Sequence, residues 1–439
     1  MPLQPWWNRR RRLLLVLLGL LVCLGFGGRW AWVTHALTQA RMSLELTRFR
    51  EAQSWIDRAQ RTDPGSVETA LMQVRLERRR GDAKAFENAL KRAAHLGAAK
   101  SDLRTEGWLL QAQQGDVKEL QEHWLELIDY VDTSDLCESL VNGFLIRYRV
   151  AEADACITNW EKDAPRNPEP LVWKARLLRF DEKLDEVAIY LERALKLEPR
   201  HVVAAYLLGQ VRFQQQRLDE ALALYQRAAQ GMEEPHPAWV REAETLRVMD
   251  RQQAAQAVMD RVLTHTDAAA VDQAWRLVGE PLGSGLVRAH LEKAQLEALA
   301  GRPAEAISWC RQVLKVDRGN IQAKVLLATA LRRVGETGEA DRLAAEIKAT
   351  HESTVQADEL RVKFRHHPND PQIRFEMGKM IFEQVSEHTG VPWLESVLQF
   401  DPHHQETHRL LAEYYERKSA EFPEFAKLAQ QHRQELRAP

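Results

Sequence analysis

Histidines are frequent in the C-terminal part of the sequence, where their imidazole side chains could bind a metal ion. Six of them are His366, His367, His388, His403, His404 and His408. His404 and His408 are four residues apart, so on a helix they would share one face. However, no glutamate follows His404 as in the H-E-x-x-H pattern of zinc proteases. We interpret these histidines as polar residues in turns that follow proline-bounded helices, and we predict no metal site and no cofactor.

Cysteines are the second type of residue that could carry chemistry. The sequence has four, of which Cys23 lies in an apolar run and Cys137, Cys156 and Cys310 lie in the body. Their spacing matches no C-x-x-C, haem-attachment or zinc-binding pattern. Cys137 and Cys156 could form a disulfide in an oxidising compartment, or they could be two small core residues. The sequence leaves both interpretations open, whereas Cys310 takes the place of a core apolar residue.

The sequence lacks the short patterns that mark common catalytic and phosphate-binding sites. It has no G-x-x-x-x-G-K-[ST] loop, no G-x-G-x-x-G that opens a helix after a strand, and no G-x-S-x-G nucleophile elbow. Its carboxylates are scattered among lysines and arginines, as on solvated helix faces. The formal net charge of −2 argues against a nucleic-acid binder, which needs a basic surface. We therefore predict that the protein is not an enzyme and binds no nucleic acid.

An apolar run near the start of the sequence has the length and the borders of a transmembrane helix. Residues 13–33 contain a single charge, Arg29, and about 20 apolar residues span the hydrocarbon core of a bilayer. Aromatic residues suited to the membrane interface border the run: Trp6, Trp7, Trp30 and Trp32. Four arginines occupy residues 9–12. Because basic residues stay on the cytoplasmic side, we expect the rest of the chain on the opposite side.

Two other interpretations of this run stay open. A cleaved signal peptide needs small residues at its cleavage site, and no convincing A-x-A pattern follows the run. A lipoprotein would carry its lipid on Cys23, but Val22 before it is larger than the residue that such a site has. An uncleaved helix that anchors the chain is the interpretation that we favour.

The body of the chain shows a repeat of 34 residues. If Gly209 is position 8 of a unit that starts at residue 202, then Ala221, Tyr225 and Ala228 are positions 20, 24 and 27. Small or apolar residues recur at these positions in four consecutive units between residues 134 and 269. The phase extends back to residue 33, with one irregular unit, and it returns after an insertion of about half a unit. A period of this length indicates an array of identical supersecondary units.

This array resembles the tetratricopeptide-repeat (TPR) family. The residues that carry the resemblance are LEP at 197–199, LLG at 207–209, LDEA at 218–221, Tyr225 and Ala228. The resemblance covers nearly everything after the apolar run and is strongest at 168–235 and 287–347. It implies an all-α fold, a right-handed α-solenoid of helix-turn-helix repeats. In this chain the apolar run predicts one transmembrane helix before the solenoid.

Each unit should be two antiparallel helices joined by a tight turn. We expect the small residues at positions 8 and 20 to face each other, so that the two helices approach to about 8 Å. The turns are polar or contain glycine, as at Gln216–Arg217, Gly301–Arg302 and Gly335–Glu336. A proline at position 32, such as Pro199, cannot continue the second helix and ends it.

In the family, the first helices of the units line a concave surface where peptide segments dock. The same positions in this chain combine aromatic side chains with arginines, both of which are frequent interface anchors. The candidate partner-binding residues are Asn142, Arg176, Arg179, Phe180, Tyr206, Gln210, Phe213 and Arg247. The resemblance thus implies other proteins or peptides as partners. The alternative is that these side chains cover each other and bind nothing specific.

These patterns divide the chain into six segments. They are a basic cytoplasmic N-terminus (1–12), a transmembrane helix (13–33), an N-terminal TPR array (34–269), an irregular half-repeat insertion (270–286), a TPR pair (287–354), and degenerate TPR units with a C-terminal capping helix (355–439). The charged last helix is the solubilising cap that a repeat array needs at its end.

The leading hypothesis is a membrane-tethered scaffold whose TPR superhelix binds partner proteins on the extracytoplasmic side of a bacterial inner membrane. The bacterial envelope enters by analogy with tethered arrays of this design. The alternative is an accessory factor for envelope assembly or export, serving pili, polysaccharide or cytochrome maturation. A third hypothesis is an enzyme with a site in the irregular C-terminal region, near His404 and His408.

Overall fold

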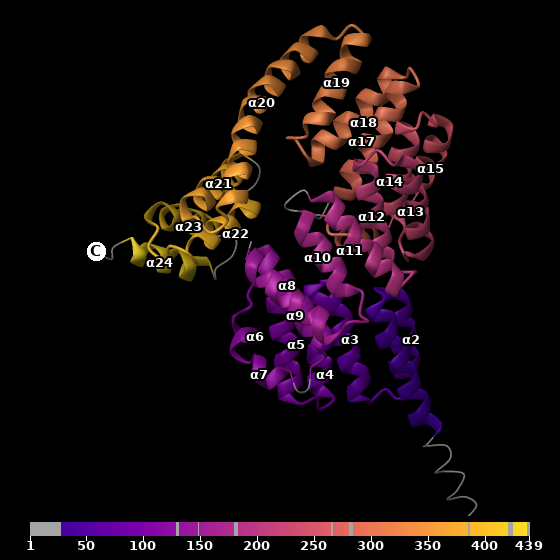
Figure 1. The fold of residues 1–439 in the computed structure, drawn as a ribbon, viewed down its shortest axis with the longest axis vertical. Helices are drawn as coiled ribbons and strands as arrows, with labels where there is room; N and C mark the ends of the chain where they lie inside the picture. Colours follow the sequence, from indigo (N-terminus) through magenta and orange to yellow (C-terminus); the bar gives the residue numbers. More distant parts are fainter. Residues whose placement is uncertain are drawn as a thin grey trace, which may run out of the picture. The chain divides into compact units, whose positions relative to one another are not determined.

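The computed structural model describes residues 28–128, 131–147, 149–179, 183–264, 267–280, 284–384, 387–419 and 425–436. Within these ranges every regular element is a helix, and no residue lies in a β-strand (Figure 1). The all-α prediction is therefore confirmed for the described part of the chain.

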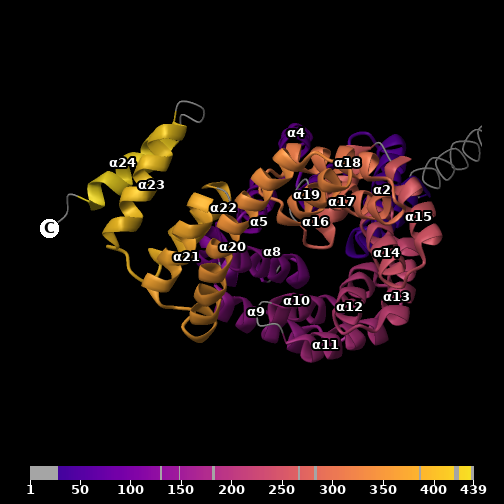
Figure 2. The ribbon, with the colours of Figure 1, turned by 90° about the horizontal axis from the view of Figure 1, so that it is seen from above.

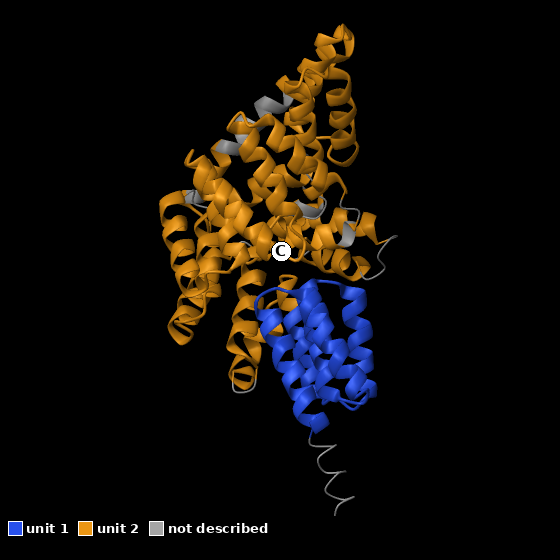
Figure 3. Ribbon diagram, turned by 90° about the vertical axis from the view of Figure 1, so that its right-hand side faces the viewer, with its two compact units in different colours: residues 1–110 blue, residues 111–439 orange. Residues whose placement is uncertain are grey.

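The chain forms two compact units, residues 1–110 and residues 111–439 (Figure 3). Unit 1 is described from residue 28 and begins with a helix at 28–45. Its other helices are α2 (Phe49–Thr62), α3 (Val67–Arg80), α4 (Ala83–His95) and the larger part of α5 (Lys100–Gln113). A core of small and aliphatic side chains joins the helix at 28–45 to α2 and α3.

Unit 2 contains the remaining helices, and consecutive helices contact each other in pairs such as α12 with α13. They are α6 (Lys118–Glu122), α7 (Trp124–Leu127), α8 (Thr133–Ile146), α9 (Val150–Asp163), α10 (Glu169–Leu178), α11 (Leu184–Leu197), α12 (Val202–Gln214), α13 (Leu218–Gly231), α14 (His236–Val248), α15 (Gln252–Thr264), α16 (Ala268–Leu277), α17 (Ser284–Leu299), α18 (Pro303–Val316), α19 (Ile321–Arg333), α20 (Thr337–His366), α21 (Pro371–Gln384), α22 (Glu387–Val397), α23 (Gln405–Lys418) and α24 (Phe425–Glu435).

The helix boundaries follow the 34-residue spacing. The second helix of a unit begins at position 17, as Leu218 does in the unit that starts at residue 202. The same position begins α2, α4, α9, α11, α13, α15, α18, α20 and α22. This regularity shows that each repeat of the sequence is one helix pair.

The turn between the two helices has a left-handed residue at position 15. In several units this residue is glycine, as at Gly81, Gly301 and Gly335, whose φ angles are 72°, 71° and 87°. Gln216 and Asp250 take the same conformation with φ of 61° and 59°. Because a side chain disfavours positive φ, the frequent glycine at this position has a local backbone cause. The predicted turns at Gln216, Gly301 and Gly335 are confirmed.

The small residue at position 8 leaves room for the residue at position 24. A methyl group added to Gly209 would lie 2.7 Å from Cε1 of Tyr225, which is position 24 of the same unit. At Gly378, which is position 8 of a later unit, the nearest atom is the backbone nitrogen of Leu394, again position 24. The ring of Tyr225 thus fills the space left by the glycine, and the expectation that Gly209 also faces Ala221 stays a prediction.

The helix pairs of unit 2 stack into a curved array. Figure 2 shows α10, α12, α14 and α17 on its inner side and α11, α13, α15 and α18 on its outer side. α17 contacts both α14 and α15, so the array continues from the unit that ends in α15 to the unit that begins with α17. The additional helix α16 contacts α14 and α17 and lies on the inner side (Figure 2). The handedness of the superhelix stays a prediction.

Three segments of the sequence interpretation look different in the structure. The irregular unit at 101–133 has its second helix divided into α6 and α7. The boundary drawn between residues 354 and 355 falls inside α20, which is a single helix of 30 residues. The insertion drawn at 270–286 begins earlier, because α16 starts at Ala268.

Residues 13–27 of the predicted transmembrane segment 13–33 lie outside the described residues, which begin at residue 28. Among the residues that are described, no helix combines the length and the apolar character needed to cross a bilayer.

Candidate partner-binding groove

The inner surface of α10, α12 and α14 gathers polar side chains on an apolar base. Tyr206 on α12 is fully buried, and its ring meets the Tyr225 ring edge-on with centroids 5.8 Å apart. Its hydroxyl accepts hydrogen bonds from Gln210 Nε2 and from Arg241 Nε, both at 3.4 Å. Arg241 on α14 also pairs with Glu244 at 2.8 Å. These residues form the base of what we call the groove.

The insertion occupies this groove. Trp275 of α16 is fully buried, and its Nε1 donates a hydrogen bond to Nδ1 of His236 at 3.0 Å. The indole also fills the space beside Gly285, where a methyl group would lie 2.2 Å from Nε1 of the tryptophan. Val271 and Val278 belong to the same hydrophobic core as the residues of α10, α12 and α14. The apolar face of α16 therefore packs onto the inner wall.

The end of the insertion makes the polar contacts. NH2 of Arg176 on α10 donates to the carbonyl oxygen of Leu277 at 2.7 Å. Glu280 pairs with Arg288 of α17 at 2.9 Å and with Arg241 at 3.5 Å. Gln210 Nε2 lies 3.4 Å from Oε1 of the same carboxylate. One carboxylate of the insertion is thus held by two guanidinium groups and one amide.

The pKa shifts in the groove reflect its burial. Burial raises the pKa of Tyr206, so the hydroxyl stays protonated, and burial lowers the pKa of Arg176. For Arg241, burial alone would lower the pKa, but Tyr206 and Glu244 outweigh it and raise the pKa. Burial also raises the pKa of Glu292, against the opposing effect of its ion pair with Arg247. None of these groups has the exposed, perturbed environment of a general acid or base.

Three of the predicted groove residues come together around the insertion: Arg176, Tyr206 and Gln210. Arg247 reaches α17 by donating from Nε to Glu292 at 2.7 Å. Phe213 is partly buried and packs against the same core. Arg179 is exposed and lies within electrostatic reach of Glu280.

The other two predicted residues are not part of this cluster as described. Asn142 of α8 donates from Nδ2 to the carbonyl oxygen of Gln113 at 3.1 Å, which gives a partner to the end of α5. Phe180 lies outside the described residues. The binding of a partner by any of these residues stays a prediction.

Sequence reasoning did not single out Arg241, Trp275 or Glu280. Arg241 occupies position 6, one residue beyond an inward position of the repeat, and the other two belong to the insertion. The signal that could have found them is the insertion itself. α16 is an amphipathic helix of ten residues between two regular repeat units. Its apolar face must be buried, so the helix must pack against one side of the array.

The histidines that could have bound a metal contact the chain itself. His404 caps α23 and accepts from the backbone N–H of Thr407 at 3.3 Å. Nε2 of His408 lies 2.8 Å from the carbonyl oxygen of Pro402, and its Nδ1 lies 2.9 Å from Nδ1 of His432. Among the described residues, no group of three or more His, Cys, Asp or Glu side chains could hold a metal ion.

Cys137 and Cys156 face each other across the α8–α9 pair. The hydrogen bond between the two thiols raises the pKa of Cys137 and lowers the pKa of Cys156. Both are free thiols in this structure. Two adjacent free thiols fit both the disulfide and the core interpretation, and the redox state of the compartment decides between them.

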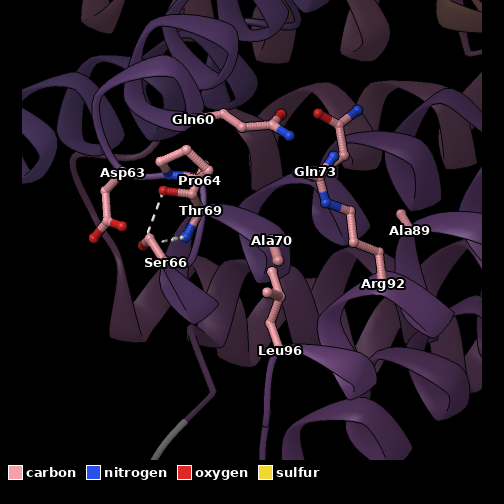
Figure 4. Close-up of a pocket in the computed structure, with 10 residues that line it drawn as sticks. All are labelled: Gln60, Asp63, Pro64, Ser66, Thr69, Ala70, Gln73, Ala89, Arg92 and Leu96. Atoms are coloured by element: carbon pink, nitrogen blue, oxygen red, sulfur yellow. Dashed lines mark hydrogen bonds between the residues drawn. The ribbon is translucent and has the colours of Figure 1, made fainter.

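A small cleft lies in unit 1 where α2 meets α3 and α4. Figure 4 shows Gln60, Gln73 and Arg92 on one side of it and Ser66 and Thr69 on the other. Ser66 Oγ accepts the backbone N–H of Thr69 at 3.1 Å and caps α3. The cavity measures about 20 Å³, which is room for a water molecule rather than for an organic ligand.

Several solved structures resemble the chain. YrrB, described as a TPR protein with an unusual peptide-binding site, is 18% identical over 46% of this chain and 97% of that chain, with a TM-score of 0.34. PilW, a type IV pilus biogenesis factor, is 16% identical over 50% and 94%, with a TM-score of 0.43. The human IFIT1 dimer with PPP-AAAA is 15% identical over 84% and 86%, with a TM-score of 0.39. At these values the likeness says nothing about function.

A match to the family described as Tetratricopeptide repeat covers residues 174–235, from the middle of α10 to the start of α14. No curated protein matches the sequence significantly. The family match shows tetratricopeptide repeats at residues 174–235, and the findings together support a TPR protein.

Proposed function

We propose that this chain is a non-enzymatic scaffold that binds segments of partner proteins on the inner side of its helical array. The observation that supports this most directly is that the inner wall already holds a piece of polypeptide. Arg176 binds a main-chain carbonyl of the insertion, and Arg241 binds its carboxylate at Glu280. A wall that recognises both groups has the chemistry that a peptide ligand requires.

We further propose that the array is tethered to a bacterial inner membrane by residues 13–33 and lies on the extracytoplasmic side. The apolar length of that segment and the arginines at 9–12 support this topology. In the helix at 28–45, Trp30 and Trp32 are 71% and 40% exposed. Exposed tryptophans next to an apolar run suit the headgroup region of a bilayer.

Site-specific crosslinking tests the binding surface. A photoreactive residue at Arg179, which is exposed beside the groove, should capture a partner of defined mass in living cells. The matched control is Ile189, which is 55% exposed on the outer helix α11 and should capture none (Figure 2). Equal capture at both positions, or none at either, would contradict the proposal. An adduct with a single secretion or maturation complex would instead favour the accessory factor.

Protease accessibility tests the topology. Protease added to intact spheroplasts should degrade the repeats, because they would lie outside the inner membrane. Full protection, with degradation only after lysis, would show that the orientation is the reverse.

A further inference from the structure

We propose that residues 268–280 act as an internal ligand, which fills the partner-binding groove until a partner displaces it. The partner segment would carry an aromatic side chain followed, about five residues later, by a carboxylate. This inference rests on the proposed function, because it names the class of partner for the same surface.

The insertion is separate from the stack of repeats. α17 contacts α14 and α15 directly, as the next unit of an uninterrupted array would. α16 is therefore not needed to connect the units before and after it. It lies on the inner surface, where the first helices of the units are lined up (Figure 2). A segment in this place competes with any ligand that approaches the inner wall.

The aromatic requirement follows from Trp275. Its indole is fully buried between α14 and α17, with Nε1 bonded to His236 and the ring against Gly285. Loss of this side chain alone would leave an empty apolar space, which is unfavourable. A partner that replaces the insertion must therefore supply an aromatic side chain at this place.

The carboxylate requirement follows from the charges of the wall. Arg241 and Arg288 both pair with Glu280, and Arg179 lies within its electrostatic reach. The side chains of Arg241 and Glu280 are only 15% and 14% exposed. When a poorly hydrated arginine loses its carboxylate, the remaining charge is strongly destabilising. A displacing segment without an acidic group at this place would leave that charge uncompensated.

The internal ligand does not use all hydrogen-bonding groups of the groove. Arg176 Nε and Gln210 Oε1 are buried and have no hydrogen-bond partner among the described residues. A partner whose backbone reaches these two atoms would gain hydrogen bonds that residues 268–280 do not make. These additional hydrogen bonds would help a separate partner chain to compete with residues 268–280, whose effective concentration is high because they belong to the same chain as the groove.

The test uses the full-length protein and a fluorescent synthetic peptide that copies residues 267–281. In the wild type the groove is filled, so the peptide should bind weakly. The substitution Glu280→Gln keeps the shape of the side chain but removes its charge and both ion pairs. We expect this variant to bind the peptide at least about tenfold more tightly than the wild type. A peptide with glutamine in place of the glutamate should show no such gain.

Matched variants show whether the gain comes from the groove. Glu220→Gln also removes a carboxylate that pairs with two arginines, Arg212 and Arg217, but on the helix α13. It should leave peptide affinity unchanged. Adding Arg241→Gln to Glu280→Gln should abolish the gain, because the receptor for the peptide carboxylate is then lost. Equal affinity of the wild type and Glu280→Gln would overturn the inference.

Hydrogen exchange provides a second measurement that does not depend on one variant. When the peptide binds, the amides of residues 268–280 should exchange faster in the wild type, because they leave the groove. If these amides stay protected while the peptide binds, the peptide lies elsewhere and the inference is wrong. Arg288→Gln, which weakens the hold on Glu280 without changing α10, α12 or α14, should give an intermediate affinity.

Failure of this inference is distinguishable from failure of the proposed function. If Glu280→Gln raises peptide affinity but no partner is captured at Arg179 in cells, the internal ligand stands and the scaffold proposal fails. If a partner is captured equally by the wild type and by Glu280→Gln, the scaffold proposal stands. In that case residues 268–280 are a fixed part of the core.

Discussion

The contact between Gly209 and Tyr225 predicts a specific loss of stability on replacing the glycine. A methyl group at position 209 would lie 2.7 Å from Cε1 and 2.9 Å from Cδ1 of Tyr225. The tyrosine ring cannot move aside easily, because it is 1% exposed and packs edge-on against Tyr206. Overpacking of this kind costs about 1–3 kcal/mol.

Helix propensity acts in the opposite direction, so the magnitude needs a control. Alanine is more favourable than glycine inside a helix by about 1 kcal/mol. Gly107 lies inside α5, and a methyl group added there meets no atom within 4 Å. Gly107→Ala should therefore stabilise its helix by about 1 kcal/mol, whereas Gly209→Ala should be neutral or destabilising by up to about 2 kcal/mol.

The assay is native-state hydrogen exchange, which reports the opening free energy of each helix pair separately. This choice matters because a repeat array need not unfold in one step. Gly209→Ala should raise exchange in α12 and α13, and the loss should vanish in a Tyr225→Leu background, where the ring is absent. If Gly209→Ala stabilises its helix pair as much as Gly107→Ala stabilises α5, then the close approach of position 8 to position 24 does not affect the free energy of unfolding.

Three further predictions follow from the structure. Burial and the neighbouring His408 lower the pKa of His432 to about 4. The unfolded segment therefore binds more protons than the folded one between about pH 6.5 and pH 4. Docking of α24, measured by hydrogen exchange of its amides, should be complete above this range and weaken as pH falls through it. Diamide, a thiol oxidant, should join Cys137 to Cys156 within one chain, as detected by non-reducing peptide mapping, because the two thiols are already hydrogen-bonded. Gln216→Gly should stabilise its turn by about 1 kcal/mol in thermal denaturation, because the glutamine has a φ of 61°.

Each of these predictions has a control. His432→Phe keeps an aromatic ring but cannot titrate, so docking of α24 should no longer depend on pH in this range. Cys310 is buried and distant in sequence from the pair, so it should stay unmodified in the folded protein. Gly335→Ala places a side chain at the same turn position with φ of 87° and should destabilise by about 1 kcal/mol. A disulfide that involves Cys310, or a stabilising Gly335→Ala, would contradict the geometry described above.

The helix pairs were predictable because their signals are local. The left-handed turn residue and the small residue at position 8 act within a single unit, so a 34-residue window contains the whole signal. The boundary drawn between residues 354 and 355 falls inside α20, where this local signal is absent. Residues 339–367 contain no glycine and no proline, so nothing in the sequence ends the helix that runs through α20 to His366.

The candidate site was predictable only in part because its contacts span long stretches of sequence. Arg176 and Leu277 are 101 residues apart, and Gln210 and Glu280 are 70 residues apart. The periodicity identifies which side chains point inward, but it does not say what they touch. For that reason Arg176 and Gln210 were found as groove residues, whereas their partners Leu277 and Glu280 were not.

The place of the insertion nevertheless follows from the periodicity once stacking is considered. Because the repeat regains its phase at residue 287, α17 must stack on α14 and α15, and no room remains for α16 between them. The helix carries an apolar face with Val271, Trp275 and Val278, which must be buried. On the inner side, the buried Tyr206 lies beside Arg241, and Arg176 donates to the insertion. An insertion with an apolar face and a terminal glutamate therefore matches the inner side.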